Sequence, residues 1–231
     1  MGRSTVGGDI AYLTISKIVV SLIGLITSML LARFRSLDEF ATYSQIILVS
    51  DLVMTFLLLG LPNSINYFLA QAKEVSEQRR FMSIYITVSS LLAILIGGCL
   101  LVSLPWIVSY FKNPMIASFA YIFVIYPWAS LMMSSVSNTC IVLGKAQKLL
   151  LFNFAMISTV LLILLIIKYA GLSFQIYMFS YTMATLFFAL FALWWIAKLV
   201  GHLRFCLDFS LIKKIFIYSI PIGLAGVVGT L

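Results

Sequence analysis

Two ionisable side chains, Lys17 and Asp51, lie inside segments that are otherwise almost entirely apolar. Ionisable residues at membrane depth are costly, about 2.5–3.5 kcal/mol each on insertion scales, so they typically mark a pathway or a binding site. They flank a short charged turn near Ser36. In an antiparallel hairpin their depths would differ by roughly 6 Å at 1.5 Å per residue, which a lysine stem can span. The spacing therefore predicts a Lys17–Asp51 charge pair at membrane depth.

Polar side chains at helical spacing extend this pattern. Ser21 and Ser28 share the helix face of Lys17, and Thr55 follows Asp51 by one turn. The candidate residues of a polar substrate pathway are Lys17, Ser21, Ser28, Asp51, Thr55, Ser134 and Asn138. A structural interpretation stays open beside this one, because small and polar residues also pack membrane helices and a lysine can extend to the nearer interface. Asp51 has no such route, which favours a paired or functional role.

The composition identifies lipid as the solvent of this chain. Of 231 residues, 63% are hydrophobic and 10% are charged, whereas soluble domains are about 45–50% apolar and about 25% charged. Apolar segments long enough to cross a bilayer as helices recur throughout. The basic residues behind the net charge of +8 are scattered in short loops, which excludes a nucleic-acid interface. The three cysteines have neither disulfide nor metal spacing, so we expect no metal and no cofactor.

We expect an all-α, polytopic membrane helix bundle with a six-helix amino-terminal lobe and the start of a second lobe. The six apolar segments span residues 10–34, 38–71, 81–102, 115–143, 149–169 and 174–199, with an interfacial loop at 103–114. Residues 1–200 would form the amino-terminal lobe. Residues 201–214 mix basic and apolar side chains and would form an amphipathic cytoplasmic linker. Residues 215–231 would form the first helix of a truncated second lobe.

Glycine and proline mark the places where these helices should bend. The segment 38–71 would be about 51 Å long as one straight helix, which exceeds the bilayer, so it must tilt, bend or protrude. Gly60 and Pro62 supply that bend. Pro127 and Pro221 lie inside two further apolar segments and predict kinks there.

Basic residues are unevenly divided between the two sides of the predicted bundle. The side of the amino terminus carries Arg3, Lys73, Arg79, Arg80, Lys145, Lys148, Lys198, Arg204, Lys213 and Lys214. The opposite side carries Arg33, Arg35, Lys112 and Lys168. Because loops rich in lysine and arginine stay in the cytoplasm, this bias predicts a cytoplasmic amino terminus.

Three stretches together resemble one family of membrane transporters. They read LARF at 31–34 followed by LDEFATY at 37–43, LGLPNS at 59–64, and YSIPIGL at 218–224. The combination resembles the multidrug/oligosaccharidyl-lipid/polysaccharide exporter superfamily, in particular its bacterial polysaccharide (O-antigen, Wzx-type) flippase branch. The chain departs from the family pattern at Ala41, where glycine is usual, and near Tyr67, where many members carry a basic residue.

The resemblance implies a transporter of two six-helix lobes around a cavity that opens alternately to each side of the bacterial inner membrane. This chain would supply one lobe and the first helix of the second, so we expect either a fragment of a longer protein or a truncated product. The implied substrate is a lipid-linked oligosaccharide, a polyprenyl-diphosphate-linked repeat unit for polysaccharide or O-antigen biosynthesis. Lys17 would attract its anionic head, and Asp51 would hold Lys17 or couple transport to an ion. Membrane lipids, a polysaccharide polymerase and chain-length proteins are the implied partners.

Three other functions stay open. A drug/cation antiporter of the same superfamily would use Asp51 as its coupling acid. A membrane enzyme of polysaccharide assembly, such as a polymerase or an acyltransferase, would need a carboxylate pair, a catalytic histidine or a nucleotide-sugar site. No such pattern is visible, and the chain has only seven acidic residues. A membrane scaffold without transport activity would tolerate neutralisation of both Lys17 and Asp51.

Overall fold

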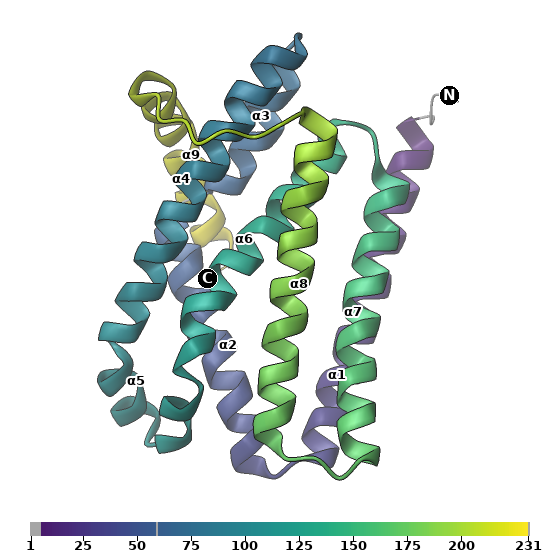
Figure 1. Cartoon of the computed structure of the whole chain (residues 1–231), viewed down its shortest axis with the longest axis vertical. Coiled ribbons are helices and arrows are strands. Elements are labelled where there is room, and N and C mark those ends of the chain that lie inside the picture. The colour runs from purple at the N-terminus through teal and green to yellow at the C-terminus, as the bar shows by residue number, and fades with distance from the viewer. Residues whose placement is uncertain (1–5, 59, 231) are drawn as a thin grey trace.

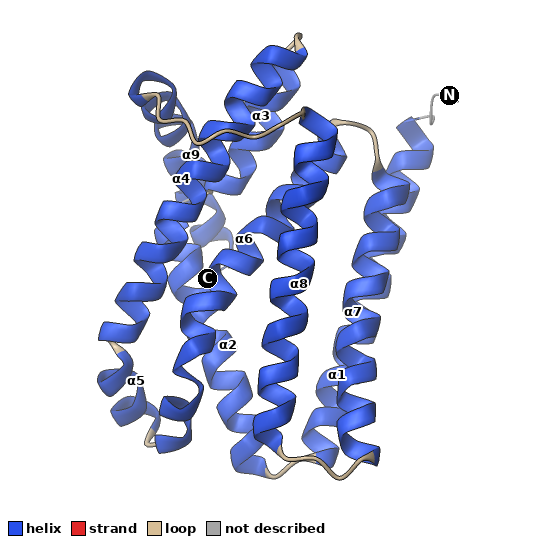
Figure 2. Ribbon diagram, viewed as in Figure 1, coloured by secondary structure: helices blue, strands red, loops and turns tan. Residues whose placement is uncertain are grey.

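The computed structural model describes residues 6–58 and 60–230, which are helical apart from short connections (Figures 1 and 2). The helices are α1 (Val6–Phe34), α2 (Leu37–Leu58), α3 (Ser64–Gln71), α4 (Val75–Val102), α5 (Leu104–Phe111), α6 (Ala120–Val142), α7 (Ala146–Tyr169), α8 (Phe174–Val200) and α9 (Phe209–Thr230). Two 3₁₀ helices, η1 (Leu61–Asn63) and η2 (Pro114–Phe119), lie between them. Arg3, Leu59 and Leu231, which belong to stretches named above, lie outside the described residues.

The described part of the chain is built to cross a membrane several times. Five helices are long and apolar enough to do so, and a sixth crossing is made if the bent pair of α2 and α3 counts as one span. Large apolar side chains cover the outside of the bundle; Leu25, Met29, Leu151 and Phe187 are 60–63% exposed. Apolar surface of this extent is typical of contact with lipid. The prediction of an all-α polytopic membrane bundle is confirmed.

Helices that follow each other in the chain are often not neighbours in space. α1 packs along α7, α6 packs against both α4 and α8, and α9 lies against η1, α2 and α4 (Figure 1). α4 and α6 approach closely at Gly97, where an added Cβ would lie 3.1 Å from the Cα of Val124. Across the same interface, the Trp128 indole N–H donates to Ser90 Oγ at 3.2 Å. Small residues and interhelical hydrogen bonds are the usual means of packing helices in lipid.

Helix formation extends into two stretches that were expected to be loop. α4 begins at Val75 rather than at residue 81, because Glu74 and Glu77 form a capping box in which the Glu77 carboxylate accepts the N–H of Glu74 at 3.4 Å. The predicted loop at 103–114 was wrong, since it contains α5. Pro105 lies in the first turn of α5, where a proline has no helical hydrogen bond to lose.

The segment 201–208 connects α8 to α9 and runs along the side of α4. The backbone N–H groups of Arg204 and Cys206 donate to the hydroxyls of Ser83 (3.2 Å) and Thr87 (3.4 Å). These two hydroxyls lie one turn apart on the same face of α4. The connection between the helices is therefore attached to α4 along its length rather than suspended between α8 and α9.

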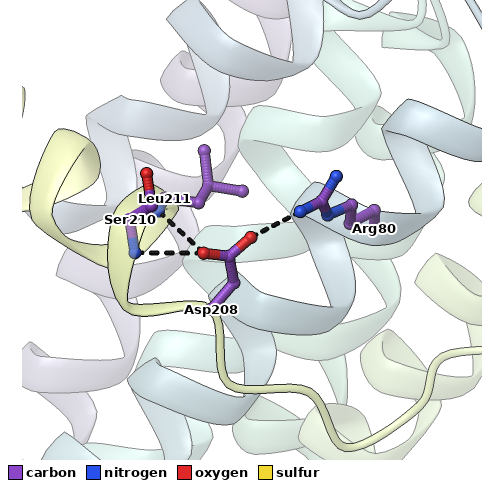
Figure 3. Close-up of polar contacts among 4 residues, drawn as sticks. All are labelled: Arg80, Asp208, Ser210 and Leu211. Atoms are coloured by element: carbon purple, nitrogen blue, oxygen red, sulfur yellow. Dashed lines mark hydrogen bonds and ion pairs between the residues drawn. The ribbon is translucent and has the colours of Figure 1, made fainter.

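Asp208 explains why α9 starts at Phe209, earlier than the residue 215 expected from hydropathy (Figure 3). Its carboxylate accepts the N–H groups of Ser210 (3.0 Å) and Leu211 (3.3 Å) and so caps the helix. It also pairs with the Arg80 guanidinium of α4 at 2.5 Å. The hydrogen bonds from Arg80 and from the Leu211 backbone lower the pKa of Asp208. The negative charge of Asp208 therefore joins the start of α9 to α4.

Asp208→Asn should lower the thermal stability of the purified protein at neutral pH. Asparagine still caps helices, so the loss reports on the ion pair. Because the folded pKa lies below the unfolded value of about 3.9, the contribution is fully present above that value and disappears as the pH falls through the folded pKa. Unfolding curves of wild type and variant, followed by tryptophan fluorescence, should converge at low pH.

A double-mutant cycle measures how much the Arg80–Asp208 pair contributes to stability, separately from what each residue contributes alone. Arg80→Gln should cause a similar loss of stability, and combining it with Asp208→Asn should add little. Losses that simply add would contradict the pairing.

Candidate functional site

The second membrane span breaks at the motif LGLPNS. α2 ends at Leu58, and the part that resumes with η1 and α3 is bent by 60° relative to α2. Gly60 has a φ of +75°, which glycine adopts readily, and Pro62 has no N–H for the helical ladder. The Ser64 hydroxyl donates to the carbonyl oxygen of Leu61 at 2.7 Å and satisfies one of the backbone groups at the break.

α9 crosses this bend at backbone contact. A Cβ on Gly60 would lie 2.8 Å from the backbone nitrogen of Gly223 and 2.9 Å from the carbonyl oxygen of Ser219. From α6, the Asn138 amide donates to the carbonyl oxygen of Pro62 at 3.0 Å. The bend is therefore fixed by contacts with both α6 and α9.

A cavity of about 550 Å³ lies beside the bend, between α2, α6 and α9. The polar part of its wall is formed by Asp51, Thr55, Asn63, Ser130 and Ser134. Its volume is within the range of about 300–1,000 Å³ that is typical of small-molecule sites. Hydroxyl, amide and carboxylate groups together accept and donate hydrogen bonds. The polar part of the wall can therefore pair with hydroxyl groups of a ligand, beside an apolar part formed by Met54, Leu58, Leu131 and Ile222.

Asp51 is the acidic member of this wall, and Tyr126 of α6 holds it in place. The Tyr126 hydroxyl donates to Asp51 Oδ1 at 3.0 Å. Among the described residues, no hydrogen bond reaches the other carboxylate oxygen, Oδ2, and the Asp51 side chain is exposed. This geometry leaves one oriented carboxylate oxygen available to a ligand hydroxyl or to a cation.

The predicted Lys17–Asp51 charge pair is wrong. Within the described part of the chain, no ion pair within 4 Å includes either side chain. α1 and α2 diverge from the turn that joins them, and α1 packs along α7 instead (Figure 1). The Asn153 amide of α7 donates to Ser16 Oγ at 3.0 Å, and the neighbouring Lys17 is exposed. The prediction failed because Lys17 and Asp51 would be close only in a tight antiparallel hairpin of α1 and α2, which does not form.

The remaining predicted pathway residues lie at three different places. Thr55 and Ser134 line the cavity together with Asp51. Ser21 and Ser28 are exposed on α1, as is Lys17, and belong to a different surface. Asn138 braces the bend through Pro62, as described above, and is not part of the cavity wall. Participation of each in transport stays a prediction.

The four glycine and proline positions expected to bend helices are all close to this cavity. Gly60 and Pro62 line it. Pro127 is buried inside α6, directly after Tyr126, and Pro221 lies inside α9, directly before the lining residue Ile222. The observed bend at Gly60 and Pro62 thus borders the polar wall, and kinks at Pro127 and Pro221 stay a prediction.

Sequence reasoning missed Tyr126, Asn63 and Ser130 as site residues. Asn63 and Ser130 had a usable signal, because Asn63 follows the proline of the bend and Ser130 precedes Ser134 by one helical turn. Tyr126 gave no usable signal, because residue spacing cannot show which partner one tyrosine of an aromatic-rich helix will have. In the residues that the structure describes, no group of three His, Cys, Asp or Glu side chains could hold a metal ion.

The fold and cavity define a multi-pass membrane helix bundle that fits a transporter-type protein. The chain belongs to the polysaccharide biosynthesis protein family, whose model matches residues 6–231. This match confirms the resemblance to the exporter superfamily and supports a role in polysaccharide synthesis or export. Comparison with curated proteins and with solved structures gave no match.

Gly60→Ala should destabilise the protein by about 1–2 kcal/mol or more. A positive φ alone costs an L residue roughly that amount, and the added Cβ would collide with the backbone of α9. Gly24→Ala is the matched control, because a Cβ there meets no atom within 4 Å. Denaturant unfolding in detergent measures both variants. Equal stability of the two would show that α9 does not rest on the bend.

Proposed function

We propose that the protein moves lipid-linked oligosaccharide, in the form of polyprenyl-diphosphate-linked repeat units, across the bacterial cytoplasmic membrane during polysaccharide or O-antigen biosynthesis. The observation that carries the proposal is the polar cavity beside a broken membrane helix in a chain of the polysaccharide biosynthesis family. The amino terminus would face the cytoplasm, as the distribution of basic loop residues predicts. A polysaccharide polymerase and chain-length proteins are the proposed partners.

The cavity would carry the sugar part of the substrate. An unpaired polar group in hydrocarbon costs several kcal/mol, so an oligosaccharide needs hydrogen-bond partners along its route. The hydroxyls of Thr55, Ser130 and Ser134 and the amide of Asn63 supply such partners. The polyprenyl chain needs none, and would stay in the lipid against the apolar outer surface of the bundle.

The broken span would supply the moving part. Discontinuous helices beside the substrate site are a recurring feature of transporters that work by alternating access. Because α9 rests directly on the bend at Gly60, a displacement of α9 would change the shape of the cavity wall.

Asp51 and Lys17 would have separate roles. The partner of Asp51 is the neutral hydroxyl of Tyr126, so its charge is not compensated by a lysine and would be balanced by a proton or a cation. In this proposal Asp51 couples transport to that ion. Lys17 lies exposed on α1 and would attract the diphosphate of the substrate.

Asp51→Asn should reduce export roughly tenfold or more, because the neutral amide cannot bind a coupling ion as the carboxylate does, and an interaction with a charged group contributes about 1.5–3 kcal/mol. The measurements are surface polysaccharide and extracted lipid-linked oligosaccharide, in cells that carry the change in the chromosomal gene. Asp38→Asn is the matched control, since Asp38 lies on the same helix outside the cavity wall. Equal export by both variants at equal protein levels would contradict the role of Asp51.

The same two measurements on a deletion strain, together with a test of drug sensitivity, distinguish the alternatives. Lost surface polysaccharide with accumulated lipid-linked units supports a flippase. Normal polysaccharide with new drug sensitivity would instead identify a drug/cation antiporter. Lost polysaccharide without accumulation would identify an enzyme of polysaccharide assembly.

Lys17→Ala should impair export while leaving thermal stability close to that of the wild type, because the side chain is exposed and forms no ion pair within the described residues. Lys17→Arg should retain most of the export, since it keeps the positive charge. Wild-type export by Lys17→Ala at equal protein levels would rule out an electrostatic role for this residue.

A further inference from the structure

A second recess lies between α7 and α8, on a different part of the bundle from the polar cavity. It has a volume of about 590 Å³, and the two sets of lining residues have no member in common. Its wall is apolar and aromatic apart from Lys145, Lys148 and Lys198. We call this recess the α7–α8 groove.

The floor of the α7–α8 groove is a cluster of aromatic rings. Between ring centroids, Phe152 of α7 lies 5.8 Å from Phe188, 6.1 Å from Phe191 and 5.8 Å from Trp195, which are all on α8. Phe187, at 63% exposed, is part of the same wall. A channel lined in this way matches an acyl chain, which needs apolar contact and no hydrogen bonds.

The three lysines gather at one end of the groove. Lys145 and Lys148 lie at the start of α7 and Lys198 lies in the last turn of α8, and both helix ends lie at the end of the bundle where α1 begins (Figure 1). The Lys198 ammonium sits 5.2 Å from the centroid of the Trp194 ring. In the described part of the chain, no ion pair within 4 Å includes any of the three lysines. Their charge is therefore available to an external anion.

The start of α7 adds to this positive charge. The residue before the helix, Lys145, makes no side-chain capping hydrogen bond. The first backbone N–H groups of α7 and the positive end of its dipole therefore face the same region as the lysines. Amines and free backbone N–H groups at one place are a favourable setting for a phosphate.

We propose that the α7–α8 groove binds one anionic phospholipid, with its phosphate at Lys145, Lys148 and Lys198 and an acyl chain along the aromatic floor. Basic pockets between membrane helices bind anionic lipid head groups in this way. The wall offers no hydroxyl or amide side chain, so it suits a small anionic head rather than an oligosaccharide. The occupant is thus a lipid of the surrounding membrane and not the transported substrate.

Native mass spectrometry of the purified 231-residue chain tests the proposal. The protein is titrated in mild detergent with phosphatidylglycerol and, separately, with zwitterionic phosphatidylcholine. One phosphatidylglycerol should be retained in clear preference. Lys145→Gln, Lys148→Gln and Lys198→Gln combined should weaken its retention at least tenfold, since each basic residue near an anionic lipid surface contributes about fivefold in affinity.

The control is Lys73→Gln, Lys213→Gln and Lys214→Gln combined. This variant makes the same change in net charge with lysines that do not line the groove, and it should retain the lipid as the wild type does. Equal weakening in both triple variants would show general charge attraction and overturn the proposal. Unchanged binding in both would also overturn it.

Ala155→Trp tests the apolar half of the site without altering charge. Ala155 lines the groove and is exposed, so a larger side chain would fill the space without overpacking the core. Retention of phosphatidylglycerol should fall while the unfolding temperature stays unchanged. The proposal is overturned if the filled variant binds normally. It is also overturned if a polyprenyl phosphate displaces phosphatidylglycerol at lower concentration, or if the groove instead joins two copies of the chain in a dimer that this variant abolishes.

Discussion

The backbone contact between α9 and the bend at Gly60 is the constraint on which the polar cavity depends. The atoms of α9 closest to Gly60 belong to the backbone of Ser219 and Gly223. Rotation of a side chain therefore could not relieve the clash that a larger residue at position 60 would cause. The contact brings Ile222 and Gly223 of α9 to the same cavity as Asp51 and Thr55 of α2, and all four residues line it. Two glycines, at positions 60 and 223, thus determine the shape of a site to which neither contributes a functional group.

Lipid imposes a second constraint, because it offers no hydrogen bonds to polar side chains. Many hydroxyls of the described helices find a hydrogen-bond partner within their own helix. Thr27, Ser50 and Thr182 each donate to the carbonyl oxygen one turn earlier, at 2.7–2.8 Å. A hydroxyl in an apolar helix is therefore no sign of a pathway by itself. Thr55 makes the same bond to the Asp51 carbonyl and still lines the cavity, so its oxygen remains free to accept.

The sequence predicted well what depends on local chemistry. Gly60 and Pro62 mark the broken span because a glycine and a proline act on their own backbone, and Asp51 stood out because a carboxylate in an apolar segment is costly. The partner of Asp51 could not be found in this way. It depends on which helices become neighbours, and α1 packs on α7 rather than along α2. α9 began earlier than expected for a related reason, since hydropathy does not register a cap such as Asp208.

α9 is attached at its start by Asp208 and, further along, by the backbone of Gly223 against the bend. Pro221 lies between these two attachments, and a proline removes one hydrogen bond from the helical ladder. The part of α9 before Pro221 is also fixed to α3, where the rings of Tyr218 and Tyr67 stack with their centroids 4.4 Å apart. The anchored start of α9 and the part that lines the cavity are thus joined at a proline, so the cavity wall can adjust there without release of the ion pair with Arg80.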